Sequence, residues 1–124
     1  MRFAARAVAF EGVTEGKVFA LSEHPEPDNA ADAGQFVILS FSEEDEQDRS
    51  LGLTGLHIEG SGIRSGYGLV EALKYDGRSV LIVGRNGLQD IEVVIAPDVA
   101  DAEAMRVAIT TCNKANASRP EQAR

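Results

Sequence analysis

Two turn-forming dipeptides, Asp76-Gly77 and Asn86-Gly87, constrain the fold of this chain more than any other feature. They lie ten residues apart, and β-rich sequence flanks both of them. A type I′ turn needs positive φ at both central residues, and Asn or Asp followed by Gly meets that need. The pattern therefore predicts a three-strand antiparallel meander. Its expected strands cover residues 68–75, 78–85 and 88–96.

Two-residue turns would also fix which residues of the meander face one another. In that register Leu73 lies opposite Val80, Val80 opposite Val93, and Ile82 opposite Ile91. These residues would form one apolar face across the three strands. The other face would hold Val70, Leu81 and Val83. Because both faces are apolar, we expect the middle strand to be covered on both sides.

The first half of the chain predicts three further strands. Residues 3–10 and 17–22 are short apolar segments, and residues 35–41 are apolar on both faces. A strand with two apolar faces is typical of a central, covered position in a sheet. Residues 23–34 contain two prolines and four acidic residues, which predicts a loop between the second and third strands.

A C-terminal helix is expected to begin at Pro97 and Asp98. Proline cannot continue a strand ladder, and an Asp can cap the first helical turn. We expect the helix from about Asp98 to about Asn116, followed by a frayed tail at 117–124. Apolar residues recur there at helical spacing, namely Val99, Ala102, Met105, Ile109 and Cys112. Cys112 is the one cysteine of the chain, so no intrachain disulfide is possible, and we expect it to be buried as a small apolar residue.

These elements predict an α+β, mostly β fold. We expect antiparallel sheets of about seven short strands, including the C-terminal meander, with one C-terminal helix packed on the sheet. The chain has 124 residues, a length typical of a single domain, so one domain over 1–124 is expected. A domain of this size can bury a core without a metal or a disulfide.

The charge of the chain is strongly negative and unevenly distributed. Twenty acidic residues against twelve basic ones give a formal net charge of −8, and residues 1–50 alone carry eleven acids and four bases. This balance argues against direct binding of nucleic acid or of an anionic membrane surface. Arg2 and Arg6 interrupt any apolar signal-peptide core, and no apolar run approaches 18 residues. We therefore expect a soluble, cytoplasmic protein.

The densest acidic segment follows the third predicted strand. Its acids are Glu43, Glu44, Asp45, Glu46 and Asp48. Such a run must be solvated, bind a cation or meet a basic partner. Ser42 with Asp45 resembles a helix-capping box, whereas the spacing of a calcium-binding EF-hand loop is absent. The pattern by itself favours a solvated acidic loop over a binding site.

His57 and Glu59 are the other candidates for chemistry. In a strand they would share one face while Leu56 and Ile58 point inward, so they could transfer a proton or ligate a metal. A surface pair is the stronger interpretation, because His24 is the one other histidine and a metal needs more ligands. The glycine-rich residues 60–68 lack the spacing of a phosphate-binding loop and predict a flexible connection. No enzyme motif is present, so no catalytic residue, metal or cofactor is expected.

The centre of the chain resembles the immunity protein 10 family of bacterial polymorphic toxin systems. Five short motifs occur in the order seen in that family. They are Glu44-Asp45-Glu46-Gln47-Asp48, Leu51-Gly52-Leu53, Ile58-Glu59, Ser65-Gly66-Tyr67-Gly68, and an acidic residue at Glu71. The resemblance covers about residues 3–96, and the segment from Phe41 to Glu71 is its most specific part.

The resemblance implies a mostly β protein that binds and neutralises a cognate toxin and is not an enzyme. Many such toxins act on nucleic acids and would present a basic cleft, which an acidic surface could occupy. The expected contacts are Glu43, Glu44, Asp45, Glu46, Asp48, His57, Glu59 and Tyr67. Two other functions stay open: a small metal-dependent hydrolase built on His57, Glu59 and the acidic run, and a non-catalytic oligomeric module that pairs through an exposed β edge.

Overall fold

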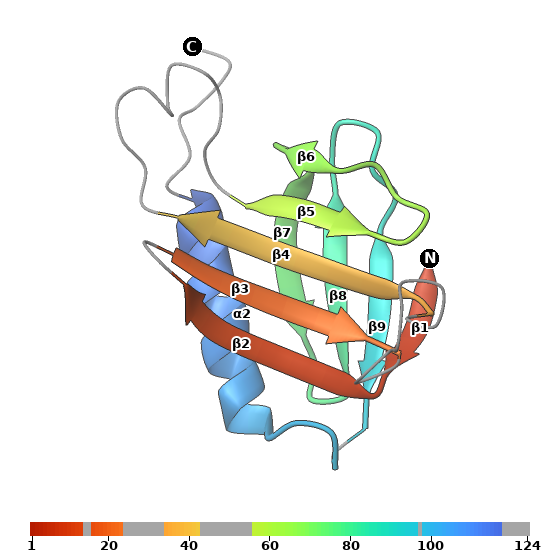
Figure 1. The fold of residues 1–124 in the computed structure, drawn as a ribbon, viewed down its shortest axis with the longest axis vertical. Helices are drawn as coiled ribbons and strands as arrows, with labels where there is room; N and C mark the ends of the chain where they lie inside the picture. The colour runs from red at the N-terminus through yellow and green to blue at the C-terminus, as the bar shows by residue number, and fades with distance from the viewer. Residues whose placement is uncertain (14–15, 24–33, 43–55, 97, 118–124) are drawn as a thin grey trace.

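A computed structural model describes residues 1–13, 16–23, 34–42, 56–96 and 98–117 of the chain. Within these residues the chain forms two sheets, dominated by antiparallel pairs, and one C-terminal helix (Figure 1). The predicted mostly β fold with a helix packed on a sheet is therefore confirmed. The described residues form nine strands, whereas about seven were expected.

The front sheet in Figure 1 has five antiparallel strands in chain order. They are β2 (Ala7–Val13), β3 (Gly16–Ser22), β4 (Phe36–Ser42), β5 (His57–Gly60) and β6 (Gly66–Tyr67). The segment predicted at 35–41 is β4, and its central position is confirmed. Its inward residues Val37 and Leu39 are fully buried, but Phe36 and Ile38 on the other face are only half-buried. The expectation that both faces of this strand are covered was therefore wrong.

The second sheet has four strands in the order β1-β9-β8-β7. They are β1 (Arg2–Ala5), β7 (Val70–Tyr75), β8 (Ser79–Gly84) and β9 (Ile91–Ile95). The predicted meander is β7-β8-β9, and β1 joins it by pairing parallel to β9.

The single strand expected at 3–10 is two strands in different sheets. The chain leaves one sheet at Ala5, passes through Arg6 and enters the other at Ala7. The Arg6 N–H donates to the Ser22 carbonyl at 2.8 Å, so the crossing residue is bound to β3. Apolar periodicity does not reveal such a crossing, because both halves bury alternate residues in the same core.

The turn at Asn86-Gly87 has the predicted geometry. Asn86 and Gly87 adopt φ of +54° and +97°, as a type I′ turn requires. The Leu88 N–H donates to the Arg85 carbonyl at 3.1 Å, which closes a two-residue turn. Val80 lies opposite Val93 and Ile82 opposite Ile91, so this half of the predicted register is confirmed.

The turn at Asp76-Gly77 differs, and the register predicted from it was wrong. Leu73 pairs with Ile82 rather than Val80, and Tyr75 pairs with Val80. The Asp76 carboxylate Oδ1 accepts the N–H groups of Arg78 and Ser79, both at 2.8 Å, which extends the turn past Gly77. The shift is two residues, so the side chains paired beyond the turn, from Ala72 to Val83, keep their faces.

A bulge at Glu71 places Val70 in the core. Val70 pairs with Gly84 and Ala72 with Val83, so one extra residue lies between the two pairs. Val70 is consequently 1% exposed, and it does not point to the side of the four-stranded sheet away from the core, as was predicted. Leu81 and Val83 do point to that side, but they are only half-buried, so the middle strand is not fully covered there.

The helix α2 (Ala102–Ala117) begins four residues later than predicted. Its cap is Asp101, whose carboxylate accepts the Ala104 N–H at 3.1 Å, while Asp98 lies in a preceding turn. Met105, Ile109 and Cys112 of the predicted apolar stripe are buried. Of the tail expected at 117–124, Ala117 is the last residue of α2, and 118–124 lie outside the described residues.

The helix packs beside β7 and behind the front sheet (Figure 1). Asn113 and Asn116 bind main-chain groups of β7 through their side-chain amides. The four-stranded sheet and the helix together form one layer, and the core lies between this layer and the inner face of the front sheet. Among the described residues, no helix has the length and apolar character needed to cross a membrane.

Candidate functional site

The acidic candidates Glu43, Glu44, Asp45, Glu46 and Asp48 lie outside the described residues. Their segment connects two strands that pair with each other, since β4 ends at Ser42 and β5 begins at His57. Ser40 pairs with His57 at this end of the sheet. The two ends of the connection that contains the acidic residues are therefore attached to the front sheet at the end where His57 lies.

His57 and Tyr67 are neighbours on the front sheet. They form a register pair of β5 and β6, and their ring centroids are 5.0 Å apart with an edge-to-face angle of 68°. His57 is half-buried, and Tyr67 is 37% exposed, one of two large exposed hydrophobic residues among the described positions. Alternation along β5 predicts the outward direction of His57, while its contact with Tyr67 depends on β6.

Glycines on both sides of Tyr67 make that contact possible. Gly66 and Gly68 adopt φ of +150° and +73°, which L side chains rarely adopt. The predicted flexible connection at 60–68 therefore contains the short strand β6. The Asn86 side chain fixes its far end by donating to the Gly68 carbonyl at 2.7 Å.

Glu59 lies on the same side of β5 as His57, as the alternation predicts. It is exposed, whereas Leu56 and Ile58 are buried at 1% and 0% exposure. Glu59 pairs with Ile38 of β4, so the carboxylate lies next to the apolar middle of the front sheet.

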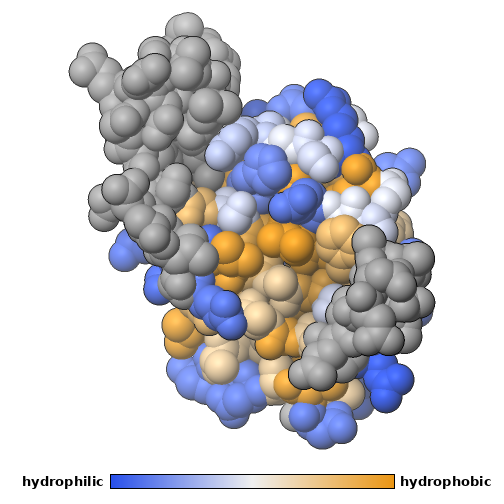
Figure 2. All heavy atoms as spheres, in the orientation of Figure 1, coloured by the Kyte–Doolittle hydropathy of each residue, from blue (hydrophilic) through white to orange (hydrophobic). Residues whose placement is uncertain are grey.

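These residues belong to one continuous surface, which we call the outer face. It consists of the described side chains of the front sheet that point away from the core, as the strand registers define them. They are Ala7, Ala9, Glu11, Val18, Ala20, Ser22, Phe36, Ile38, Ser40, His57, Glu59 and Tyr67. Figure 2 shows a broad apolar area over β2, β3 and β4 on this side of the molecule.

The charges on the two sheets differ. The charged residues of the outer face are Glu11 and Glu59, and none of its described members is Lys or Arg. The four-stranded sheet instead pairs its charges, since Arg2 binds Glu92 at 2.8 Å and Arg85 binds Glu71 at 3.4 Å. The outer face is thus apolar in its middle and purely acidic in its charged groups.

The described residues contain few groups that could bind a metal or act as a reactive thiol. No cluster of three or more His, Cys, Asp or Glu residues forms there. His57 and Glu59 share a face, but within the described residues no third ligand of these types joins them. Cys112 is buried as predicted, and burial raises the pKa of its thiol to about 12, which keeps it protonated.

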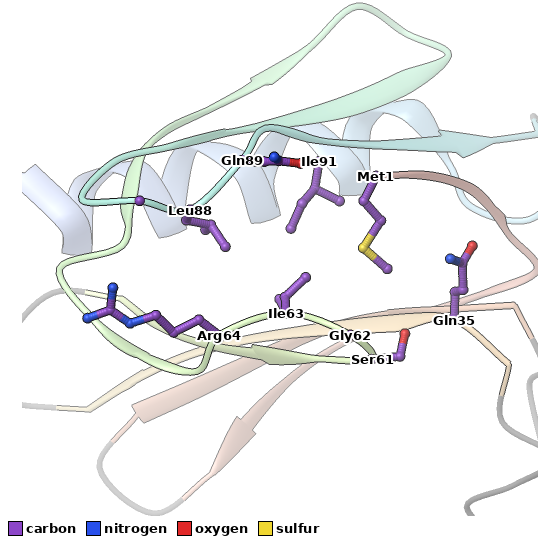
Figure 3. Close-up of a pocket in the computed structure, with 10 residues that line it drawn as sticks. Met1, Gln35, Ser61, Gly62, Ile63, Arg64, Leu88, Gln89 and Ile91 are labelled. Carbon is purple, nitrogen blue, oxygen red and sulfur yellow. The ribbon is translucent and has the colours of Figure 1, made fainter.

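A cavity of about 350 Å³ opens between the two layers, and residues 61–64, which connect β5 to β6, form part of its wall (Figure 3). Met1, Ile63, Leu88 and Ile91 point into it, and its wall is about equally polar and apolar. Arg64 lies at its margin and donates from Nη1 to the Asn86 carbonyl at 3.1 Å. Of the predicted contact residues, the three that the structure describes, His57, Glu59 and Tyr67, do not line this cavity. Sequence patterns could not predict it, because its wall comes from separate segments.

Comparison of the chain with models of known protein families and with curated proteins finds no match. The family resemblance therefore rests on the motifs between Glu44 and Glu71, and it stays a prediction from those motifs.

Proposed function

We propose that this chain is an immunity protein, a cytoplasmic inhibitor that binds a cognate bacterial toxin in a stoichiometric complex and blocks it. The main support for the proposal is the outer face, which has an apolar middle with acidic groups and the His57–Tyr67 pair beside it. In such a surface the apolar middle supplies the buried area of a complex, while charges at its margin set orientation and encounter rate. The inhibitor acts by occupying the toxin and has no cofactor.

The acidic segment supports the proposal by its position in the chain. Residues 43–55 connect β4 and β5 at the end of the outer face where His57 and Tyr67 lie. A toxin that acts on nucleic acid needs a basic cleft for phosphate groups. The acids from Glu43 to Asp48 would attract that cleft over a long range and bring it to the outer face.

The three described candidates would make the close contacts. Tyr67 offers an exposed ring that loses little conformational entropy on binding. The edge-to-face contact with His57 holds this ring in place. Glu59 would pair with a basic side chain of the toxin beside Ile38. These contacts would determine the dissociation rate, whereas the acidic segment would determine the association rate.

Coexpression with the toxin encoded by the neighbouring gene tests the proposal directly. The chain should protect the host cell, and the two proteins should copurify as a stoichiometric complex. Equal killing with and without this chain would show that it is not the immunity protein for that toxin.

Charge reversal tests the role of the acidic segment. The double variant Glu44→Lys with Glu46→Lys should slow association about tenfold and weaken its dependence on salt. A variant with the same change in net charge, Asp98→Lys with Glu103→Lys, alters two exposed acids near the start of the helix and should associate like the wild type. Equal rates for both double variants would remove the acidic segment from the mechanism.

A further inference from the structure

Four strand edges end the two sheets, and one of them is long and open. The edge at β7 is covered by the helix through Asn113 and Asn116. The edge strand β6 has two residues and β1 has four. The edge strand β2 has seven, and within the described residues no strand pairs with its outer side (Figure 1). Edges of this length are templates for pairing unless the sequence blocks them.

The sequence of β2 contains none of the usual blocking features. Its residues are Ala-Val-Ala-Phe-Glu-Gly-Val, with no Lys, no Pro and one charge at Glu11. The side chains of Val8 and Phe10 point toward the core but stay half-buried at this margin. Phe10 contacts the Phe19 ring edge-to-face with centroids 5.9 Å apart, and the Lys17 Nζ lies 5.5 Å from its centroid. The core is therefore only partly covered along β2.

We propose that β2 pairs antiparallel with β2 of a second copy of this chain, which joins two five-stranded sheets into one continuous sheet. Pairing all seven residues of each copy requires a twofold axis at Phe10, the midpoint of Ala7–Val13. Ala9 then lies opposite Glu11 of the second copy, and the two Phe10 residues lie opposite each other.

The strand fits its own copy in this register for two reasons. The one charge, Glu11, faces an alanine rather than a second carboxylate, so like charges are not opposed. The two half-buried Phe10 rings meet on the core side and cover each other, which extends the Phe10–Phe19 contact across the axis. The inference is independent of the proposed function, because it rests on the unpaired main chain of the β2 edge and not on toxin binding.

Charge variants at Ala9 test both the dimer and its register. Ala9→Glu would place two pairs of carboxylates opposite each other, whereas Ala9→Lys would place Lys opposite Glu11 twice. We expect the dimer dissociation constant of the Glu variant to exceed that of the Lys variant by about tenfold, measured by sedimentation or light scattering. Ala9 is exposed in the single chain, so neither change should alter the urea midpoint of the monomer.

The matched controls are Ala4→Glu and Ala4→Lys on β1, an exposed alanine on another edge strand. These two variants should dimerise equally. A wild-type chain that stays monomeric across a wide concentration range would overturn the proposal. Equal dissociation constants for the two Ala9 variants, or an equally large difference between the two Ala4 variants, would also overturn it, because the contact would then lie elsewhere.

Crosslinking provides a second measurement of the register. A mixture of Ala9→Cys and Glu11→Cys proteins should form a disulfide-linked dimer on mild oxidation, because these positions face each other. Ala9→Cys alone should crosslink poorly, since diagonal neighbours lie about 7–8 Å apart, too far for a relaxed disulfide. Cys112 is fully buried and does not compete. Equal crosslinking of the mixture and the single variants would contradict the axis at Phe10.

Discussion

The side chain of Asn113 pairs with Leu73 in the way that a neighbouring strand would. Its Oδ1 accepts the Leu73 N–H and its Nδ2 donates to the Leu73 carbonyl, both at 2.8 Å. Asn113→Ala would leave two part-buried main-chain groups without these partners, so we expect a loss of about 1–3 kcal/mol in the free energy of unfolding, measured with urea. Lys114→Ala, at an exposed position on the same helix, is the control and should change it by less than about 0.5 kcal/mol. An equal effect of the two variants would show that the Asn113 pair contributes nothing to stability.

The helix start gives a second prediction with a built-in control. Asp101 accepts the Ala104 N–H, so Asp101→Ala should lower the free energy of unfolding by about 0.5–2 kcal/mol. Asp98→Ala removes the same charge three residues earlier, from an exposed turn, and should be close to neutral. If urea unfolding showed a larger loss of stability for Asp98→Ala than for Asp101→Ala, the cap would be Asp98, as the sequence pattern predicts.

Cys112 predicts how stability depends on alkaline pH. Burial raises the pKa of its thiol from 9.0 to about 12 in the folded chain, so the unfolded chain loses its proton first. The stabilising effect of the protonated thiol is complete below pH 9 and is lost as the pH rises toward 12. Cys112→Ala should flatten the decline of stability above pH 9, measured by urea unfolding at several pH values. A wild-type thiol that reacts with a thiol reagent at pH 8 without unfolding would contradict its burial.

The outer face predicts the position of the toxin contact. Ile38→Lys places a cation beside Glu59 in the apolar middle of the proposed surface, and we expect the affinity for the toxin to fall at least tenfold in calorimetric titration. Val94→Lys puts the same side chain on the outward side of the other sheet, where Val94 is also half-buried, and should bind like the wild type. Urea unfolding of both variants separates loss of contact from loss of fold. Equal toxin affinities of the two variants would show that the toxin does not bind at the outer face.

The meander shows how far local sequence determines this fold. Asn86 and Asp76 both precede glycine, and the sequence pattern treats them alike. Asn86 adopts positive φ and forms the predicted turn, while the Asp76 carboxylate accepts the N–H groups of Arg78 and Ser79, and the turn moves one residue along to Gly77 and Arg78. That choice depends on competition between side-chain and main-chain hydrogen bonds, which a dipeptide pattern does not contain. Because the shift was even, the predicted faces were kept, except at Val70, which the bulge at Glu71 turns into the core.

Other features depended on contacts between distant segments. Residues 3–10 carry the alternation of one strand, but their division between two sheets is set by pairing of Arg2 with Glu92 and of Ala7 with Ser22. For the candidate site, alternation predicted the directions of His57 and Glu59. The contact of His57 with Tyr67 required the glycine conformations at 66 and 68, and these follow from the backbone rather than from composition.

The parallel pairing of β1 with β9 has a consequence for how the chain folds. Arg2 and Glu92 are register partners and also form an ion pair, so the first strand completes its sheet only when the last one is present. Between them, the chain builds the whole front sheet, which makes the closing contact one of very high sequence separation. Cutting the chain between the front sheet and the meander would put β1 on one fragment and the three strands that it completes on the other. The two sheets should therefore unfold together in a single transition.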